Sequence, residues 1–135
     1  NLEFNIVGKI NIFDKFFLGL FTNVVVHGFI NKLDKLVKNS ICGICNLKIS
    51  TGIQSKIFTY MSYGLPALVS KNSLPKNLLE NKEVIVYKNN NQLIHNILKL
   101  INNKKISNKI SNNAFNALKN KFELSKAYGN YSKII

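Results

Sequence analysis

The sequence contains no arginine. All 19 of its basic residues are lysine, against six acidic residues, which gives a formal net charge of +13. Arginine is the side chain whose planar fork reads guanine and phosphate, and no helix-turn-helix, zinc-finger or RNA-recognition pattern is present. The sequence therefore argues against a nucleic-acid-binding module. The lysines are expected to form a solvated surface whose summed field can attract an anion such as a nucleotide or an acidic bilayer.

Cysteine and histidine are too scarce for most metal and redox sites. Cys42 and Cys45 have C-x-x-C spacing, but a zinc site needs four ligands and no second pair exists. The motif lies in an apolar run, and residues three apart on a strand point to opposite faces. We expect two reduced, buried cysteines, as in a cytoplasmic protein, and no metal. Neither His27 nor His95 has a visible catalytic or metal-binding partner.

Long apolar segments are also missing. No run approaches the roughly 18 apolar residues of a membrane-spanning helix, and the N-terminus lacks the basic-then-apolar layout of a signal peptide. The sequence does not begin with methionine, and residues 2–7 already read as a strand. We interpret the chain as a fragment that begins inside a larger protein. Its 135 residues, 46% of them hydrophobic, predict one compact unit with a real core.

The sequence does contain short apolar runs that alternate with helical patterns. The apolarity of these runs is continuous, which is typical of strands covered on both faces. The alternation predicts an α/β fold, a parallel sheet flanked by helices, with ligands bound at the carboxyl ends of the strands. The expected strands are residues 2–7, 23–30, 40–47, 66–70 and 84–87, and the expected helices lie within 9–22, 31–38, 53–63, 91–101 and 106–118.

The last two expected helices are amphipathic. Their apolar residues recur at helical spacing, which predicts that each helix packs one stripe onto the sheet. The first stripe is Leu93, Ile94, Ile97, Leu98 and Ile101, and the second is Ile106, Ile110, Ala114, Ala117 and Leu118.

Residues 50–70, STGIQSKIFTYMSYGLPALVS, contain start and stop signals for a helix that is followed by a strand. Ser50 or Thr51 can cap a helix that starts near Ile53, because a hydroxyl oxygen accepts one of the free backbone N–H groups of the first turn. Gly64 stands where a left-handed C-terminal residue is needed. The inner face of this helix is expected to consist of Ile53, Ile57, Tyr60 and Met61.

The start of that helix is a candidate anion site. Free N–H groups and the positive end of the helix dipole favour phosphate there. Gly52 lets a ligand approach the backbone closely, and Lys56 adds a full charge one turn further on. The alternative interpretation is a well-capped helix whose glycine serves only the turn.

The string TGIQSKIFTYMSYGLPALVS resembles the donor-nucleotide segment of GT-B family-four (group 1) glycosyltransferases, whose form is G-x-G-I-x-x-K-x-x-E-x-M-x-x-G-x-P-V-V-x. Other ordered matches are FNIVG, NVVVHGFI, NKLDKLVKNSICGICNL and the closing FELSKAYGNYSKII. Together they cover nearly the whole chain. The resemblance implies a Rossmann-like sheet, the C-terminal half of a GT-B fold. It also implies that residues 1–135 are the nucleotide-sugar-binding domain, incomplete at its N-terminus and without the acceptor domain.

The resemblance assigns roles to specific residues. The family's turn against the nucleotide base matches Gly28, Phe29 and Ile30, and its frequent lysine matches Lys56. The residues that match its diphosphate-binding turn are Thr51, Gly52, Ile53 and Gln54. No residue is an evident general base, so the resemblance assigns no catalytic residue.

The sequence departs from the family at two acidic positions. Thr59 stands where an acidic residue usually bonds the ribose hydroxyls, and Thr51 stands at the earlier position of the paired-glutamate motif. Threonine can make only a neutral hydrogen bond, which is about half as strong as a charge-assisted one. A degenerate, non-catalytic nucleotide-binding domain therefore stays open as an alternative. A sugar-nucleotide epimerase of similar fold is not supported, because histidine and acidic groups are too sparse.

The resemblance implies a hexosyltransferase-type enzyme without metal or other cofactor. Its donor would be a UDP- or GDP-linked sugar, and its acceptor a polysaccharide or glycolipid in cell-surface glycan synthesis. The fragment alone is expected to be inactive, since the acceptor domain would lie elsewhere. The lysine-rich surface suggests peripheral contact with the anionic inner face of the cytoplasmic membrane.

Overall fold

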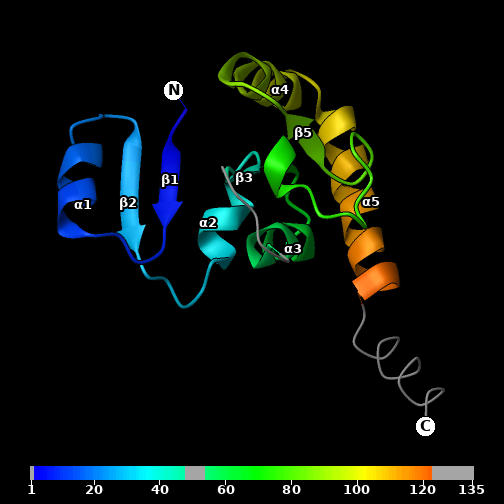
Figure 1. Ribbon diagram of the computed structural model, residues 1–135, viewed down its shortest axis with the longest axis horizontal. Coiled ribbons are helices and arrows are strands. Elements are labelled where there is room, and N and C mark those ends of the chain that lie inside the picture. The colour runs from blue at the N-terminus through cyan, green and yellow to red at the C-terminus, as the bar shows by residue number, and fades with distance from the viewer. Residues whose placement is uncertain (1, 48–53, 123–135) are drawn as a thin grey trace, which may run out of the picture. The chain divides into compact units, whose positions relative to one another are not determined.

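The computed structural model describes residues 2–47 and 54–122 and divides the chain into two compact units, Asn1–Leu36 and Val37–Ile135 (Figure 1). That residues 1–135 form one domain stays a prediction. The division follows from strand pairing: within the described residues, the strands of each unit hydrogen-bond only to strands of the same unit. Both sheets are parallel, as the sequence predicts.

Unit 1 is a β-α-β arrangement. Strand β1 (Phe4–Val7) and strand β2 (Val24–Gly28) pair in parallel, and helix α1 (Ile12–Leu18) connects them. The helix begins after Asn11, whose side-chain oxygen accepts a 2.7 Å hydrogen bond from the Asp14 backbone N–H. A strand crossover through a helix is the connection that parallel neighbours need. Residues 9–22 thus hold the predicted short helix and loop.

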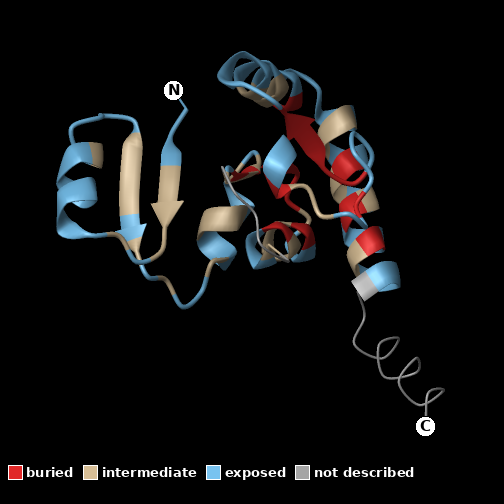
Figure 2. Ribbon diagram, viewed as in Figure 1, coloured by how far each residue is buried: buried red, intermediate tan, exposed pale blue. Residues whose placement is uncertain are grey.

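Unit 1 buries little apolar surface. None of its described residues is fully buried, and α1 contributes no buried side chain (Figure 2). Two strands and one short helix are too few elements to enclose a core. Its large exposed apolar side chains are Leu2, Phe4, Ile12, Phe13, Phe16, Phe17, Leu20, Phe21 and Phe29.

Unit 2 holds the main core. Its three parallel strands have the order β3-β4-β5, and α2 (Asp34–Lys38) contains the boundary between the units. All the predicted strands and helices of this part are confirmed, with ends shifted by a few residues. The elements are β3 (Gly43–Cys45), α3 (Ser55–Ser62), β4 (Ala67–Ser70), the 3₁₀ helix η1 (Lys71–Ser73), β5 (Ile85–Tyr87), α4 (Asn90–Asn102) and α5 (Lys104–Phe122).

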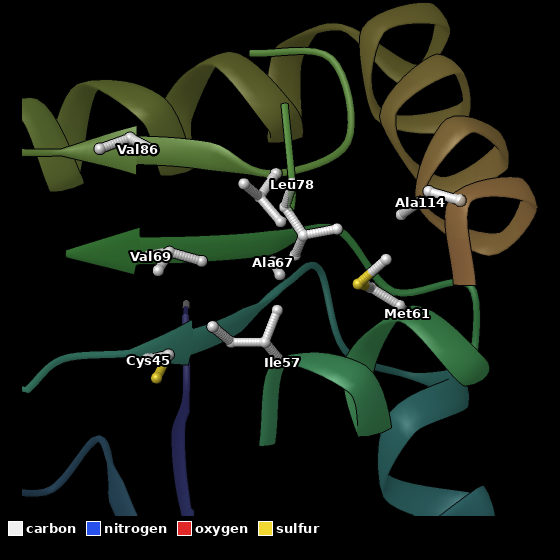
Figure 3. Close-up of a cluster of buried hydrophobic side chains, with 10 residues drawn as sticks. Cys45, Ile57, Met61, Ala67, Val69, Leu78, Val86 and Ala114 are labelled. Atoms are coloured by element: carbon white, nitrogen blue, oxygen red, sulfur yellow. The ribbon is translucent and has the colours of Figure 1, made fainter. Parts of the chain in front are cut away.

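Strand β4 lies in the middle of this sheet and is buried along its whole length. Successive strand residues point to opposite faces, so Ala67 and Val69 join one apolar cluster and Leu68 joins the other. On the first face, Ile57 and Met61 of α3 and small residues of α5 cover the strands (Figure 3). The second face packs against Leu100, Ile110 and other residues of α4 and α5. The continuous apolar run of β4 therefore correctly predicted that both of its faces are covered.

The predicted stripe of α4 is partly wrong. Leu93 and Ile97 pack against the core, and Leu100, which the stripe omitted, is buried. Ile94 and Leu98 remain 56% and 47% exposed, because only a narrow face of the helix reaches the sheet. The stripe of α5 is confirmed: Ile110, Ala114 and Ala117 are buried, while Ile106 and Leu118 pack at the edges of the clusters.

The cysteines are free thiols that lie on opposite faces, as predicted. Cys45 is buried in the first cluster, whereas Cys42 is half-buried against the second. Burial raises the pKa of the Cys42 thiol to about 11. The prediction that both are buried thus holds fully only for Cys45.

Gly43 sits directly under the Tyr60 ring, whose hydroxyl donates a 3.2 Å hydrogen bond to the Ile44 carbonyl. A Cβ at Gly43 would overlap the ring carbons. Gly43→Ala is therefore expected to lower the free energy of unfolding by about 2 kcal/mol, as overpacking does. Denaturant unfolding measures this, with Tyr60→Ala as the second arm of a double-mutant cycle. If Gly43→Ala costs as much in the Tyr60→Ala background, the contact is not the cause.

Candidate functional site

The candidate site lies where β3 ends and α3 begins. The helix starts at Ser55, and Gln54 is its N-cap with extended backbone angles. The predicted start near Ile53 is therefore slightly early, and the predicted cap at Ser50 or Thr51 falls on residues that the structure does not describe. Three predicted site residues, Thr51, Gly52 and Ile53, lie outside the described residues, as does Ser50.

The N-cap residue of α3 differs from those of three other helices in the described part of the chain. At α1, α4 and α5, the residues Asn11, Asn89 and Asn103 each accept a hydrogen bond of 2.7 to 3.0 Å from an N–H three residues on. Gln54 makes no side-chain capping hydrogen bond. First-turn N–H groups have no acceptor within the helix, so the positive end of α3 can accept an anionic ligand. An anion site at this helix start stays a prediction.

Lys56 places a full positive charge in the first turn. Its side chain is exposed, and its ammonium is near enough to Cys45 to influence that thiol. Burial raises the pKa of Cys45, and a hydrogen bond from Ser73 and the charge of Lys56 partly oppose that shift. The charge of Lys56 thus lies near the carboxyl end of β3, where a parallel sheet binds its ligands.

Thr59, which the resemblance matches to an acidic position, makes a hydrogen bond within its own helix. Its hydroxyl donates a 3.1 Å hydrogen bond to the Ser55 carbonyl one turn earlier. The oxygen can still accept a hydrogen bond from a ribose hydroxyl, but the proton is committed to the helix backbone. Gln54, Lys56 and Thr59 are brought together within the first two turns of α3.

The predicted base-contacting residues belong to unit 1. Gly28 ends β2 with a φ of +70°, a left-handed conformation that strains any other residue, and its carbonyl accepts a 2.7 Å hydrogen bond from Gly8. Phe29 follows with 81% of its surface exposed, and Ile30 is half-buried. The positive φ alone accounts for a glycine at position 28. The exposed Phe29 ring offers a flat apolar surface.

Two serines that the sequence analysis missed hold the backbone just beyond β3. Ser70 ends β4 and Ser73 ends η1; both are buried, and both hydrogen-bond to the backbone of Leu47. Serine is mostly exposed in proteins. The available signal was a fully apolar strand, ALVS, that closes on serine, with a second serine three residues later.

Neither histidine approaches a catalytic or metal-binding arrangement. His27 shares a hydrogen bond with Asn5, and His95 is exposed on α4. Across the described residues, no three or more His, Cys, Asp or Glu side chains come together as a metal site. Within the same residues, none of the helices is long and apolar enough to cross a membrane.

Residues 1–103, about three quarters of the chain, match the family model described as glycosyl transferases group 1. The chain belongs to this family. The family resemblance predicted from the residue motifs is thereby confirmed. A search of curated protein sequences finds no match.

Solved structures support the GT-B assignment of the fold. TarM matches 97% of the chain at 16% identity with a TM-score of 0.80. A TarM variant from S. aureus, solved in complex with fondaparinux, alpha-GlcNAc-glycerol and UDP, gives a TM-score of 0.81 at 17% identity over 97% of the chain. The C-terminal domain of the group 1 glycosyl transferase LpcC from Francisella tularensis matches 77% of the chain at 17% identity with a TM-score of 0.64. The predicted Rossmann-like sheet of a GT-B C-terminal domain is thus confirmed.

This group 1 glycosyltransferase chain spans only part of these relatives. It covers 28% of each TarM chain and 56% of the LpcC domain.

Proposed function

We propose that this chain is the donor-binding part of a glycosyltransferase that transfers a sugar from a UDP- or GDP-linked donor to a polysaccharide or glycolipid acceptor in cell-surface glycan synthesis. Family membership supports the reaction class. The presence of UDP in the complex of the structurally similar TarM variant supports a nucleoside-diphosphate donor. The proposed donor-binding residues are Gly28, Phe29, Ile30, Thr51, Gly52, Ile53, Gln54, Lys56 and Thr59.

The observation that carries the proposal is the start of α3, where the Gln54 side chain makes no capping hydrogen bond and the exposed Lys56 adds a positive charge. In three other helices of the described part, an asparagine side chain accepts a hydrogen bond from a first-turn N–H, whereas the Gln54 side chain does not do so at α3. An anionic ligand can take the place of that cap. A diphosphate fits because it offers several acceptor oxygens to both the N–H groups and the Lys56 ammonium.

In the proposed reaction, this half of the site acts on the leaving group. Negative charge develops on the nucleoside diphosphate as the bond to the sugar breaks. The helix N-terminus and Lys56 already point their positive charge at this leaving group and stabilise it without having to reorient. Electrostatic stabilisation by such preorganised groups is usually the largest single contribution to catalysis. We propose that this step needs no metal.

The acceptor domain is proposed to lie outside these 135 residues. Unit 1 supports this, because its two strands and one helix bury none of their described residues fully. An incomplete domain has this property when the elements that cover it are not included. We therefore expect the 135-residue chain to be inactive alone and the intact protein to transfer sugar.

The intact enzyme is proposed to be cytoplasmic and peripheral at the inner face of the membrane. Charge supports this placement: the sequence carries 19 lysines against six acidic residues. Lysines near an anionic leaflet each contribute about 1 kcal/mol of attraction. A lipid-linked acceptor would be met at that surface.

A non-catalytic nucleotide-binding domain is the second candidate. The Thr59 hydroxyl favours it, since the hydroxyl donates to the helix backbone and carries no charge for the ribose. This candidate predicts weak binding and no transfer in the intact protein.

A thermal-shift screen of the intact protein with UDP, GDP, CDP and ADP tests the donor site. A nucleotide at about one hundred times its dissociation constant adds about 2.7 kcal/mol of stability, which raises Tm by several degrees. We expect a shift with UDP or GDP that tripolyphosphate does not reproduce. No shift with any nucleotide would contradict donor binding, and a shift without transfer would support the second candidate.

Lys56→Ala tests the share of the side-chain charge in donor binding. We expect the dissociation constant of UDP or GDP to rise about tenfold, since a single charge-assisted contact is lost while the backbone contacts remain. Isothermal titration measures the change. Lys99→Ala on α4 is the matched control, because this lysine is also exposed on a helix but lies on an element remote in sequence. Equal loss in both variants would mean that the effect of Lys56 is only that of net charge.

A further inference from the structure

Two buried hydroxyl groups hold the backbone just beyond β3. The Leu47 N–H donates to Ser73 Oγ at 3.0 Å and to Ser70 Oγ at 3.3 Å, and Ser70 Oγ donates to the Leu47 carbonyl at 3.1 Å. The two hydroxyl oxygens lie 2.7 Å apart. Ser70 and Ser73 are only 9% and 1% exposed. These contacts satisfy both polar backbone groups of Leu47.

The contacts replace a strand ladder that has ended. The pairing of β3 with β4 stops at Cys45 and Val69, two residues before Leu47. Beyond that point, side chains bind the backbone of Leu47 across 23 and 26 residues of sequence. The position of Leu47 is therefore set by the end of β4 and by η1.

Burying two hydroxyls is unfavourable unless they are hydrogen-bonded. Their partners here are Leu47 and each other, together with the Cys45 thiol, whose pKa is raised by burial and lowered by the bond from Ser73. The cluster thus specifies one position for Leu47, where an apolar contact would tolerate several.

We propose that Ser70 and Ser73 are positioning residues for the donor site, an inference that rests on the proposed function. Leu47 is the last described residue before residues 48–53, and Gln54 and α3 follow them. The serines fix the backbone of Leu47, and Ser73 also bonds the Cys45 thiol, which lies near the charge of Lys56. They do not contact the donor themselves. A displacement of about 1 Å at such a site is enough to weaken binding or catalysis 100-fold.

The test compares Ser70→Ala and Ser73→Ala with Ser111→Ala in the intact protein. Ser111 on α5 also donates a hydrogen bond, to the Ser107 carbonyl at 3.0 Å, and is half-buried, but it has no link to Leu47. We expect both site variants to raise the donor KM about tenfold and the UDP or GDP dissociation constant in parallel. The acceptor KM should stay unchanged, and Ser111→Ala should leave all three constants at the parent values.

Each variant is assayed well below its own Tm, so that a loss of folding stability is not mistaken for a loss of donor binding. Ser73→Cys keeps a small side chain with a hydrogen to donate, and it is expected to recover part of the affinity for UDP or GDP. A Ser73→Cys protein that is well folded yet binds the nucleotide no better than Ser73→Ala would contradict the proposal. Unchanged donor KM in both alanine variants would also overturn it, as would an equal rise in Ser111→Ala. If the parent protein itself binds no nucleoside diphosphate, the proposed function fails instead.

Discussion

Replacing Gly52 with valine in the intact protein is expected to raise the dissociation constant for UDP or GDP more than 100-fold while leaving the fold intact. In the proposed site the diphosphate lies against the backbone that precedes α3, and a branched side chain would occupy that space. A loss of this size corresponds to about 2.7 kcal/mol of binding free energy. Isothermal titration measures the affinity, and thermal unfolding without ligand shows that the protein is folded.

A graded series makes this prediction sharper. Gly52→Ala introduces only a methyl group and should lose less affinity than Gly52→Val. Gly52→Val should lose more affinity than Lys56→Ala, because the valine blocks the backbone contacts, whereas the lysine substitution removes one side-chain contact. Gly52→Ala should lose at least about as much affinity as Lys56→Ala. Binding of Gly52→Val at the parent affinity would mean that the diphosphate does not approach this turn.

Lys121→Met is expected to lower the free energy of unfolding by about 3 kcal/mol. The Lys121 ammonium contacts both carboxylate oxygens of Glu83, at 2.8 and 2.9 Å, and Glu83 also accepts a 2.9 Å hydrogen bond from the Leu79 N–H. The Glu83 side chain is only 7% exposed, so removing its partner leaves a buried charge. Such losses run to about 3 to 5 kcal/mol, and the 36% exposure of Lys121 favours the lower end.

Chemical denaturation with two further variants tests that account. Lys119→Met on the same helix has no ion pair among the described residues and should change stability by less than about 0.5 kcal/mol. Adding Glu83→Gln to Lys121→Met removes the stranded charge, so the double variant should be more stable than Lys121→Met. If the double variant is less stable, then the stranded charge is not the source of the loss.

The elements could be predicted because their signals are local. The strand around Ala67 reads as a continuous apolar run between Pro66 and polar residues, and α5 shows a regular apolar repeat. Gly64 follows Tyr63, the C-cap of α3, with a φ of +65°, the left-handed conformation that its position after the helix predicts. Order of elements and parallel pairing followed from these patterns, and the family resemblance supplied the GT-B fold.

The remaining features depend on contacts between distant parts of the chain. The apolar run ALVS indicates that Ser70 closes a buried strand, but no local pattern predicts its contact with Leu47, which lies 23 residues away. The exposure of Ile94 depends on how α4 meets the sheet. Propensity favoured Ser50 or Thr51 as a helix cap, whereas the backbone places Gln54 there. The division into two units reflects strand pairing, which composition does not encode.

The most direct measurement is a nuclear magnetic resonance titration of the intact, ¹⁵N-labelled protein with UDP and GDP, following the backbone amides at two helix starts. The amides of Ser55 and Lys56 at the start of α3 should shift and saturate with one of the nucleotides. Those of Asn90 and Asn91, at the start of α4 that Asn89 caps, should not. Saturable shifts confined to other parts of the protein, or no shifts with either nucleotide, would contradict a donor site at α3.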